Sequence, residues 1–334
     1  MKKIGKHYYH ITWLFGLVVA VLFTVALHAE ESPTFKIILV PDTQIYAMRH
    51  PDTFYIQMKW IADHADDIAF VLQQGDITNN NTEAQWNVAA FSFRLLDGKI
   101  PYVLAVGNHD YINREGTDIS RNATLANQFF PYETYSKMKG FGGAFESGKL
   151  ENTWFTFHAG GIDWLVLSLE FGPRNRVLDW AAQIVKNYPK HKIIVNTHAY
   201  MDNNDIRMKP GTNHHPQQHY SFGKMTGEDS VNDGEMMWEK FVSQYPNMMF
   251  VFSGHVIGKG VGRRVDKGKH GNDVYQILAN YQMRPQGGEG YLRIMTLNTS
   301  NKTIDVKTYS PLLNKYLEEP DHQFLFENAD FQIK

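Results

Sequence analysis

Five short apolar segments of this sequence each end in a side chain that can bind a metal ion or carry a proton. In chain order these residues are Asp42, Asp76, the group Asn108-His109-Asp110, His198 and His255. Carboxylate, amide and imidazole groups together suit first-row divalent ions such as Mn, Fe or Zn. Imidazole can also donate or accept a proton near neutral pH. One polar residue at a strand end is ordinarily a turn former, but the ordered set of five indicates a site.

The segments before these residues have the length and composition of buried strands. They are Phe35–Val40, Ile68–Leu72, Tyr102–Val106, Lys192–Val195 and Met249–Phe252, with Trp164–Leu169 as a further candidate strand. Helical patterns lie between them, at Phe54–His64, Glu83–Leu96, Arg176–Tyr188 and Glu235–Tyr245. Alternating strands and helices predict an α/β protein whose central strands are parallel and bind ligands at their carboxyl ends. Gly75, Gly107 and Gly254 are expected to let the backbone turn sharply there.

The C-terminal region follows a different pattern, with strands and turns but no intervening helices. Val274–Ala279, Tyr291–Leu297 and Thr303–Thr308 are predicted strands, and residues 298–301 are the predicted loop of an antiparallel hairpin. We therefore expect residues 30–334 to form one domain. Its predicted architecture is a four-layer α/β/β/α sandwich of two mixed sheets flanked by helices.

The order carboxylate, carboxylate, Asn-His-Asp, His and Gly-His resembles the calcineurin-like metallophosphoesterase superfamily over roughly residues 35–308. Gly75-Asp76 and Gly107-Asn108-His109-Asp110 are the most specific parts of the resemblance. Asp42 and Gln44 make the chain most similar to bacterial members whose first motif reads Asp-x-Gln. The resemblance implies a metallo-dependent phosphatase-like fold and hydrolysis of a phosphate mono- or diester by a metal-bound hydroxide.

The resemblance also implies a role for each matching residue. Asp76 would bridge two divalent ions, with Asp42 and Gln44 on the first ion. Asn108, His198 and His255 would complete the second. His109 would protonate the leaving oxygen, and Asp110 would hold the His109 ring in orientation.

Two departures from the superfamily pattern fall on the first ion. Gln44 stands where His is usual, and Ile257 stands where a second His normally follows Gly254-His255. Oxygen ligands favour harder ions, so the first position is expected to prefer Mn or Mg and to bind weakly. The second position retains its full set and is expected to bind one ion firmly.

Two further segments are candidates for the site. The His-rich residues 213–219 either lie over the site and lend a ligand or form a solvated polar loop. Tyr281, Gln282 and Arg284 follow a predicted strand and are candidates for substrate contact.

The N-terminus has the pattern of a targeting segment. Lys2, Lys3 and Lys6 precede an apolar run at residues 11–27, and the small residue Ala29 follows shortly after it. Residues 1–29 are therefore predicted to be a signal peptide, with a membrane anchor at 11–27 as the alternative. Either predicts an extracytoplasmic protein, periplasmic, secreted or membrane-anchored, with membrane contact only through an uncleaved segment.

Composition restricts the chemistry and the partners. The chain has no cysteine, which excludes disulfides, thiolate ligands and a cysteine nucleophile. The net charge of −2 becomes −5 without residues 1–29, so no nucleic-acid-binding surface is expected.

The expected substrate is a phosphorylated small molecule or polymer. The main alternative is a non-catalytic, single-metal binding module for a polysaccharide or protein. A two-carboxylate glycosidase is disfavoured because the acids are interleaved with metal-type ligands. The oligomeric state stays open.

Overall fold

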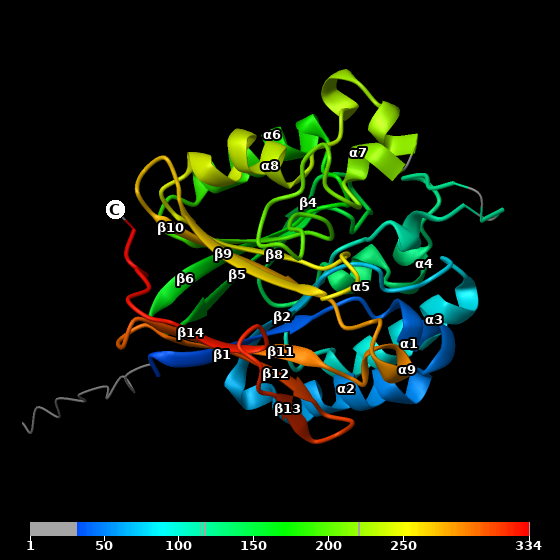
Figure 1. The fold of residues 1–334 in the computed structure, drawn as a ribbon, viewed down its shortest axis with the longest axis horizontal. Helices are drawn as coiled ribbons and strands as arrows, with labels where there is room; N and C mark the ends of the chain where they lie inside the picture. Colours follow the sequence, from blue (N-terminus) through cyan, green and yellow to red (C-terminus); the bar gives the residue numbers. More distant parts are fainter. Residues whose placement is uncertain (1–31, 114, 117, 220, 334) are drawn as a thin grey trace, which may run out of the picture. The chain divides into compact units, whose positions relative to one another are not determined.

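The computed structural model describes residues 32–113, 115–116, 118–219 and 221–333, in which two mixed β-sheets carry helices on their outer sides (Figure 1). The predicted targeting segment lies outside these residues. Within them, no helix combines the length and apolar character needed to cross a membrane.

The first sheet has the strand order β13-β12-β11-β1-β2-β3, with β14 paired to β12. Its strands are β1 (Thr34–Val40), β2 (Ile68–Gln73), β3 (Tyr102–Leu104), β11 (Leu292–Asn298), β12 (Thr303–Ser310), β13 (Lys315–Leu317) and β14 (Gln323–Phe326). β1, β2 and β3 are parallel, whereas β11 and β12 form the predicted antiparallel hairpin. Helices α1 (Gln44–Arg49), α2 (Pro51–Asp63) and α3 (Glu83–Phe93) lie on its outer side (Figure 1).

The second sheet has the order β4-β5-β6-β7-β8-β10-β9. Its strands are β4 (Phe141–Ala144), β5 (Thr153–Ala159), β6 (Ile162–Ser168), β7 (Lys192–Asn196), β8 (Met248–Ser253), β9 (Val261–Lys267) and β10 (Asp273–Ala279). The four strands β6, β7, β8 and β10 are parallel. Helices α6 (Asn175–Asn187) and α8 (Gly234–Lys240) lie on its outer side (Figure 1). Short helices occupy the connections: α4 (Ala126–Phe129), α5 (Tyr132–Tyr135), α7 (Pro216–His219) and α9 (Pro285–Gly288).

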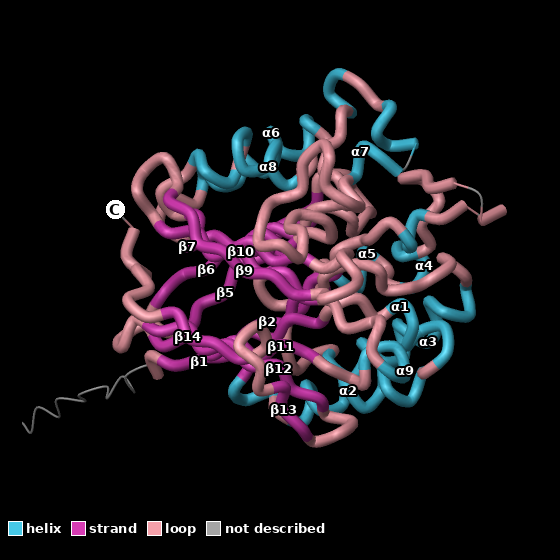
Figure 2. Tube along the Cα trace, viewed as in Figure 1, coloured by secondary structure: helices cyan, strands magenta, loops and turns pink. Residues whose placement is uncertain are grey.

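The central strands read as continuous apolar runs because both of their faces are covered. On β7, Ile194 packs in the cluster that contains the first-sheet strands, while Ile193 and Val195 pack in the cluster that contains α6. α6 has the spacing of an amphipathic helix and buries Val177, Leu178, Ala181, Ile184 and Val185. Figure 2 shows the strands gathered between helical layers. The predicted four-layer sandwich is therefore confirmed.

Three strands of the second sheet were not predicted: β4, β5 and β9. β5 pairs antiparallel with β6 through a two-residue turn, Gly160-Gly161. Both glycines have positive φ, 66° and 72°, which such tight hairpin turns require. β9 carries the basic residues Arg263 and Arg264 and pairs antiparallel with β10 at the edge of the sheet.

Candidate metal centre

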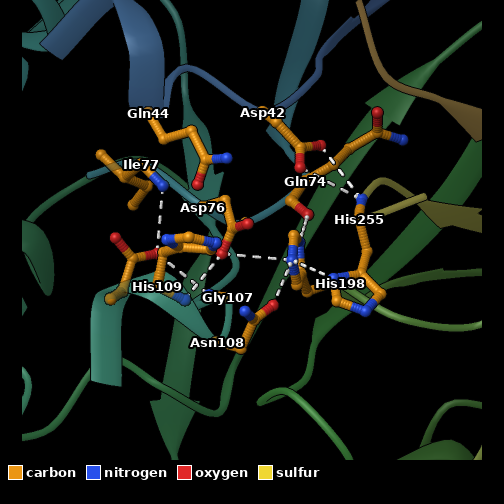
Figure 3. Close-up of polar contacts among 12 residues, drawn as sticks. Asp42, Gln44, Gln74, Asp76, Ile77, Gly107, Asn108, His109, His198 and His255 are labelled. Atoms are coloured by element: carbon orange, nitrogen blue, oxygen red, sulfur yellow. Dashed lines mark hydrogen bonds and ion pairs between the residues drawn. The ribbon is translucent and has the colours of Figure 1, made fainter. Parts of the chain in front are cut away.

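Donor atoms from three predicted residues converge on the Nε2 atom of a fourth, His198 (Figure 3). The Oδ1 atoms of Asn108 and Asp76 each lie 3.2 Å from it, and the Nδ1 atom of His255 lies 3.1 Å away. Asp76 and Asn108 follow β2 and β3 of the first sheet, while His198 and His255 follow β7 and β8 of the second. All four side chains are buried. The structure thus brings together the complete set that the sequence predicted for the second ion.

Backbone carbonyls fix which nitrogen of each imidazole is free to bind an ion. His198 Nδ1 donates to the Gln74 carbonyl at 2.8 Å, and His255 Nε2 donates to the His214 carbonyl at 2.9 Å. A carbonyl only accepts, so these nitrogens carry a hydrogen, and in the neutral form of each ring the facing nitrogen offers its lone pair. Of the two alternatives for the His-rich loop, a contact with the site is the one seen at His214, which contributes its backbone oxygen.

The backbone turn expected at the glycines is seen at Gly75 but not at Gly107. Gly75 has a φ of 96°, and a Cβ there would lie 2.3 Å from His198 Nδ1. Gly107 has no positive φ; it provides room, since a Cβ there would lie 2.2 Å from Asp76 Oδ1. Asp76 and His255 themselves have positive φ, 49° and 75°. Such conformations cost about 1–3 kcal/mol each and cluster at functional sites.

Burial and neighbouring charges shift the titration of these groups. Burial alone would raise the pKa of Asp76, but the charges of His198 and His109 hold it below its usual value. Burial would lower the pKa of His198, yet Asp76 and Asp42 raise it to about 9. Burial and the charge of His198 lower the pKa of His255 to about 3. One imidazole is thus held as a cation beside the carboxylates, in the place where a metal ion would supply positive charge.

The predicted first position is built around Asp42, which lies two residues beyond the end of β1. Its carboxylate accepts the backbone N–H of His255 at 3.1 and 3.2 Å and the Asn280 Nδ2 at 3.0 Å. Burial raises the pKa of Asp42 to about 7. Gln44 Nε2 donates to Gln282 Oε1, whereas Gln44 Oε1 is buried and has no hydrogen-bond partner among the described residues.

The missing second histidine is not replaced at its own place in the chain. Ile257 is 39% exposed, and its carbonyl accepts a hydrogen bond from Asn203. The segment after β10 supplies buried polar side chains there instead, those of Asn280 and Gln282. The neighbouring candidates point elsewhere, since the Tyr281 hydroxyl contacts Thr308 and Arg293, and the Arg284 guanidinium lies 5.2 Å from the Tyr291 ring centroid.

His109 lies beside this cluster and is only partly buried. Its backbone N–H donates to Asp76 Oδ1 at 2.9 Å, and its Nδ1 donates to the Asn79 carbonyl at 2.7 Å. The ring is therefore oriented by a backbone oxygen, which leaves Nε2 as the nitrogen available for proton exchange.

The prediction that Asp110 orients His109 is wrong. The fully buried Asp110 carboxylate accepts hydrogen bonds from backbone N–H groups of Ile77, Thr78 and Gly107 at 2.8–3.0 Å, and from the Thr78 hydroxyl at 2.8 Å. These bonds tie the segment after Asp76 to the segment that precedes Asn108. Burial and the nearby Asp76 raise the pKa of Asp110 to about 6. Asp110 thus supports two ligand-bearing loops.

The donor set fits divalent metal ions. Asp76, His198 and His255 have ligand atoms within 4.8 Å of one another, and the Asn108 amide oxygen adjoins them. Two imidazoles, one carboxylate and one amide oxygen suit Mn, Fe or Zn. An ion at the first position would give the buried Gln44 oxygen a partner, and a buried acceptor without one is costly.

Residues 35–258 match the calcineurin-like phosphoesterase family. The chain is also similar to the uncharacterized protein YvnB of Bacillus subtilis (strain 168), with 27% identity over 293 residues. That match covers 85% of this chain and 20% of YvnB, so the chain spans a fifth of that relative's length.

Among solved structures, the purple acid phosphatase PPD1 from yellow lupin (Lupinus luteus) seeds superposes with a TM-score of 0.53 and 12% identity. The match covers 90% of this chain and 55% of the lupin chain, and it shows a shared fold. GAP50, the anchor in the inner membrane complex of Plasmodium, gives a TM-score of 0.49 with 10% identity, covering 90% of this chain and 89% of GAP50.

Proposed function

The chain belongs to the calcineurin-like phosphoesterase family, and from that premise we propose that it hydrolyses a phosphate mono- or diester with the help of bound divalent ions. The observation that carries the proposal is the convergence of Asp76, Asn108 and His255 on His198 Nε2 at 3.1–3.2 Å. Family membership supports a hydrolase in preference to a binding module.

The residues on hand divide into two positions for ions. Asp42, Gln44 and Asp76 would hold the first ion, and Asp76, Asn108, His198 and His255 would hold the second, which would be Mn, Fe or Zn. Bound divalent ions supply Lewis acidity, which polarises phosphate oxygens and lowers the pKa of a water molecule toward neutrality. The carbonyls of Gln74 and His214 accept from the far nitrogens of the two imidazoles, so the neutral rings would present their other nitrogens to an ion.

His109 would act as the general acid. Its Nδ1 is engaged with the Asn79 carbonyl, so a proton delivered to the leaving oxygen would come from Nε2. The bond from its backbone N–H to Asp76 Oδ1 sets the ring beside the proposed ions. A positioned proton donor of this kind contributes roughly 10²–10⁴-fold to a rate.

The proposal predicts metal-dependent release of phosphate or alcohol from at least one class of phosphoester. Metal-free protein would be supplied with Mn, Zn, Fe or Mg and tested on nucleotides, phospholipids, sugar phosphates and phosphoproteins. Turnover is expected only when an ion is present, and a chelator should abolish it. Firm metal binding with no release from any class would instead favour the single-metal binding module.

We also propose that the protein works outside the cytoplasm, in the periplasm or as a secreted or anchored protein. The supporting feature is the basic, apolar and small-residue order of residues 1–29. In its own host the protein should appear in an extracytoplasmic fraction, and N-terminal sequencing should place the start of a cleaved form near Glu30. Recovery of the full-length chain from the cytosol would contradict this.

A further inference from the structure

The segment that follows β10 forms one wall of the first ion position. Asn280 and Gln282 are 5% and 8% exposed, which is low for uncharged polar side chains. Asn280 Nδ2 donates to Asp42 Oδ2 at 3.0 Å, and its Oδ1 accepts the backbone N–H of Gln282 at 2.9 Å. Asn280 thereby ties the backbone of Gln282 to Asp42, and the Gln282 amide oxygen faces Gln44.

The amide of Gln44 is incompletely satisfied. Gln44 Nε2 donates to Gln282 Oε1, yet Gln44 Oε1 has no partner within the described part of the chain. In Figure 3 this amide oxygen points toward Asp76. Leaving a buried acceptor without a partner costs about 1–3 kcal/mol, so native sites rarely do so without a reason.

We propose that Gln282 is a ligand of the first ion, and that this ion is held by oxygen atoms alone, from Asp42, Gln44, Asp76 and Gln282. The inference rests on the proposed metal-dependent function and extends it. The position would not be a depleted version of a histidine-bearing one. It would be a different kind of site, completed by a residue 25 positions beyond Ile257, where the family pattern has its histidine.

The chemistry follows from the donor types. When an ion enters, the bond between the two glutamines opens, and both amide oxygens turn to the ion. Asp42 and Asp76 supply the negative charge, while the amides add oxygen donors without adding charge. Such a set favours hard ions such as Mg or Mn. The neighbouring position, with two imidazoles, favours Zn or Fe. The chain would therefore select two different ions side by side.

A mixed-metal titration tests this directly. The purified protein would be stripped, loaded with one equivalent of Zn, and titrated with Mn while free and bound Mn are followed by electron paramagnetic resonance. Wild type should bind one Mn in addition to the Zn. Pulsed spectra of that Mn should lack the nitrogen coupling of a directly bound imidazole.

Three variants test whether Mn affinity depends on the Gln282 side chain itself. Gln282→Ala should weaken Mn binding at least about tenfold, the lower end of the loss caused by removing even an outer partner of a ligand, and should leave the Zn content unchanged. Gln282→Glu restores an oxygen donor and adds a charge, so it should bind Mn at least as tightly as wild type. Met283→Ala is the matched control, because Met283 is adjacent and 68% exposed, and it should leave Mn affinity unchanged.

Two results would overturn the inference. Unchanged Mn affinity in Gln282→Ala would remove Gln282 from the ligand set, and strong imidazole coupling in the wild-type Mn spectrum would place a histidine on the first ion. Retained Zn in Gln282→Ala shows that the fold is intact. Neither result would affect the proposed hydrolysis, which fails only if the protein binds no divalent ion at the imidazole-bearing position or does not turn over phosphoesters.

Discussion

His198→Ala is expected to release the firmly held ion and to abolish nearly all phosphoester hydrolysis. His198 Nε2 is the atom on which the donors of Asp76, Asn108 and His255 converge, so its loss removes the centre of the set. Removing an outer partner of a ligand already costs 10–100-fold in metal affinity, so removing the ligand itself should cost at least about 100-fold. Elemental analysis of the dialysed protein, together with turnover at saturating metal, measures both effects.

Matched histidine variants make this result specific. His255→Ala should behave like His198→Ala, because it removes the other imidazole from the same set. His158→Ala should keep its ion and its activity, since His158 is exposed and pairs with Asp163 at 2.6 Å. The unfolding of each ligand variant should be compared with that of metal-free wild type. Full metal content in both ligand variants would refute the assignment of the second position.

His109→Ala should lower turnover by roughly 10²–10⁴-fold while leaving folding and metal content nearly unchanged. The loss should depend on the leaving group. An alkoxide is a strong base and needs a proton, whereas nitrophenolate leaves readily without one. The defect should therefore be large for alkyl esters and small for nitrophenyl esters, when the two are compared at the same metal loading.

Asp110→Asn is the informative comparison for His109. The substitution replaces one acceptor oxygen with an NH₂ group that faces the N–H groups of Ile77 and Gly107 or of Thr78. Each unsatisfied group costs about 1–3 kcal/mol, so stability should fall and turnover should drop equally for both kinds of ester. An equal loss on both esters in His109→Ala, with release of metal, would instead make His109 a structural or ligand residue.

The strand ends were predictable because the sequence carries a strong signal there. Central parallel strands are covered on both faces, so they appear as short apolar runs, and polar donors stand out where the runs stop. β1, β2, β7 and β8 accordingly begin and end within one or two residues of their predicted limits. The predicted third strand was too long, because β3 ends at Leu104 and leaves Ala105 and Val106 to lead into Gly107.

Edge strands have a less distinctive sequence pattern than the apolar runs of the central strands. β5 alternates between buried and partly exposed positions, and β9 reads as a charged loop because it contains Arg263, Arg264 and Lys267. Both are defined by antiparallel pairing with a neighbour that is separated by a turn. Sequence patterns record that pairing only indirectly.

The candidate ligand side chains could be predicted from the sequence, but the groups that hold them in place could not. Asp76, Asn108, His198 and His255 stood out as polar side chains at strand ends. The family resemblance implied that they bind one ion, and the structure brings them together. The sequence could not reveal that the carbonyls of Gln74, Asn79 and His214 orient the imidazoles, because every residue has a carbonyl. Asp110 was misassigned since adjacency in the chain does not place it beside His109. Gln282 was visible only as a candidate for substrate contact, because its partner Gln44 lies 238 residues away.

The candidate donors come from both sheets, and this couples ion capture to folding of the whole domain. Asp42, Asp76 and Asn108 follow strands of the first sheet, whereas His198 and His255 follow strands of the second. No fragment from one sheet contains the set, so the unfolded chain has little affinity for the ion. Binding then stabilises the native state by RT ln(1 + [ion]/Kd), about 2.7 kcal/mol when the free ion is at 100 times Kd. A bound ion would therefore link the two sheets, and the metal concentration in the surroundings would change the protein's resistance to unfolding and proteolysis.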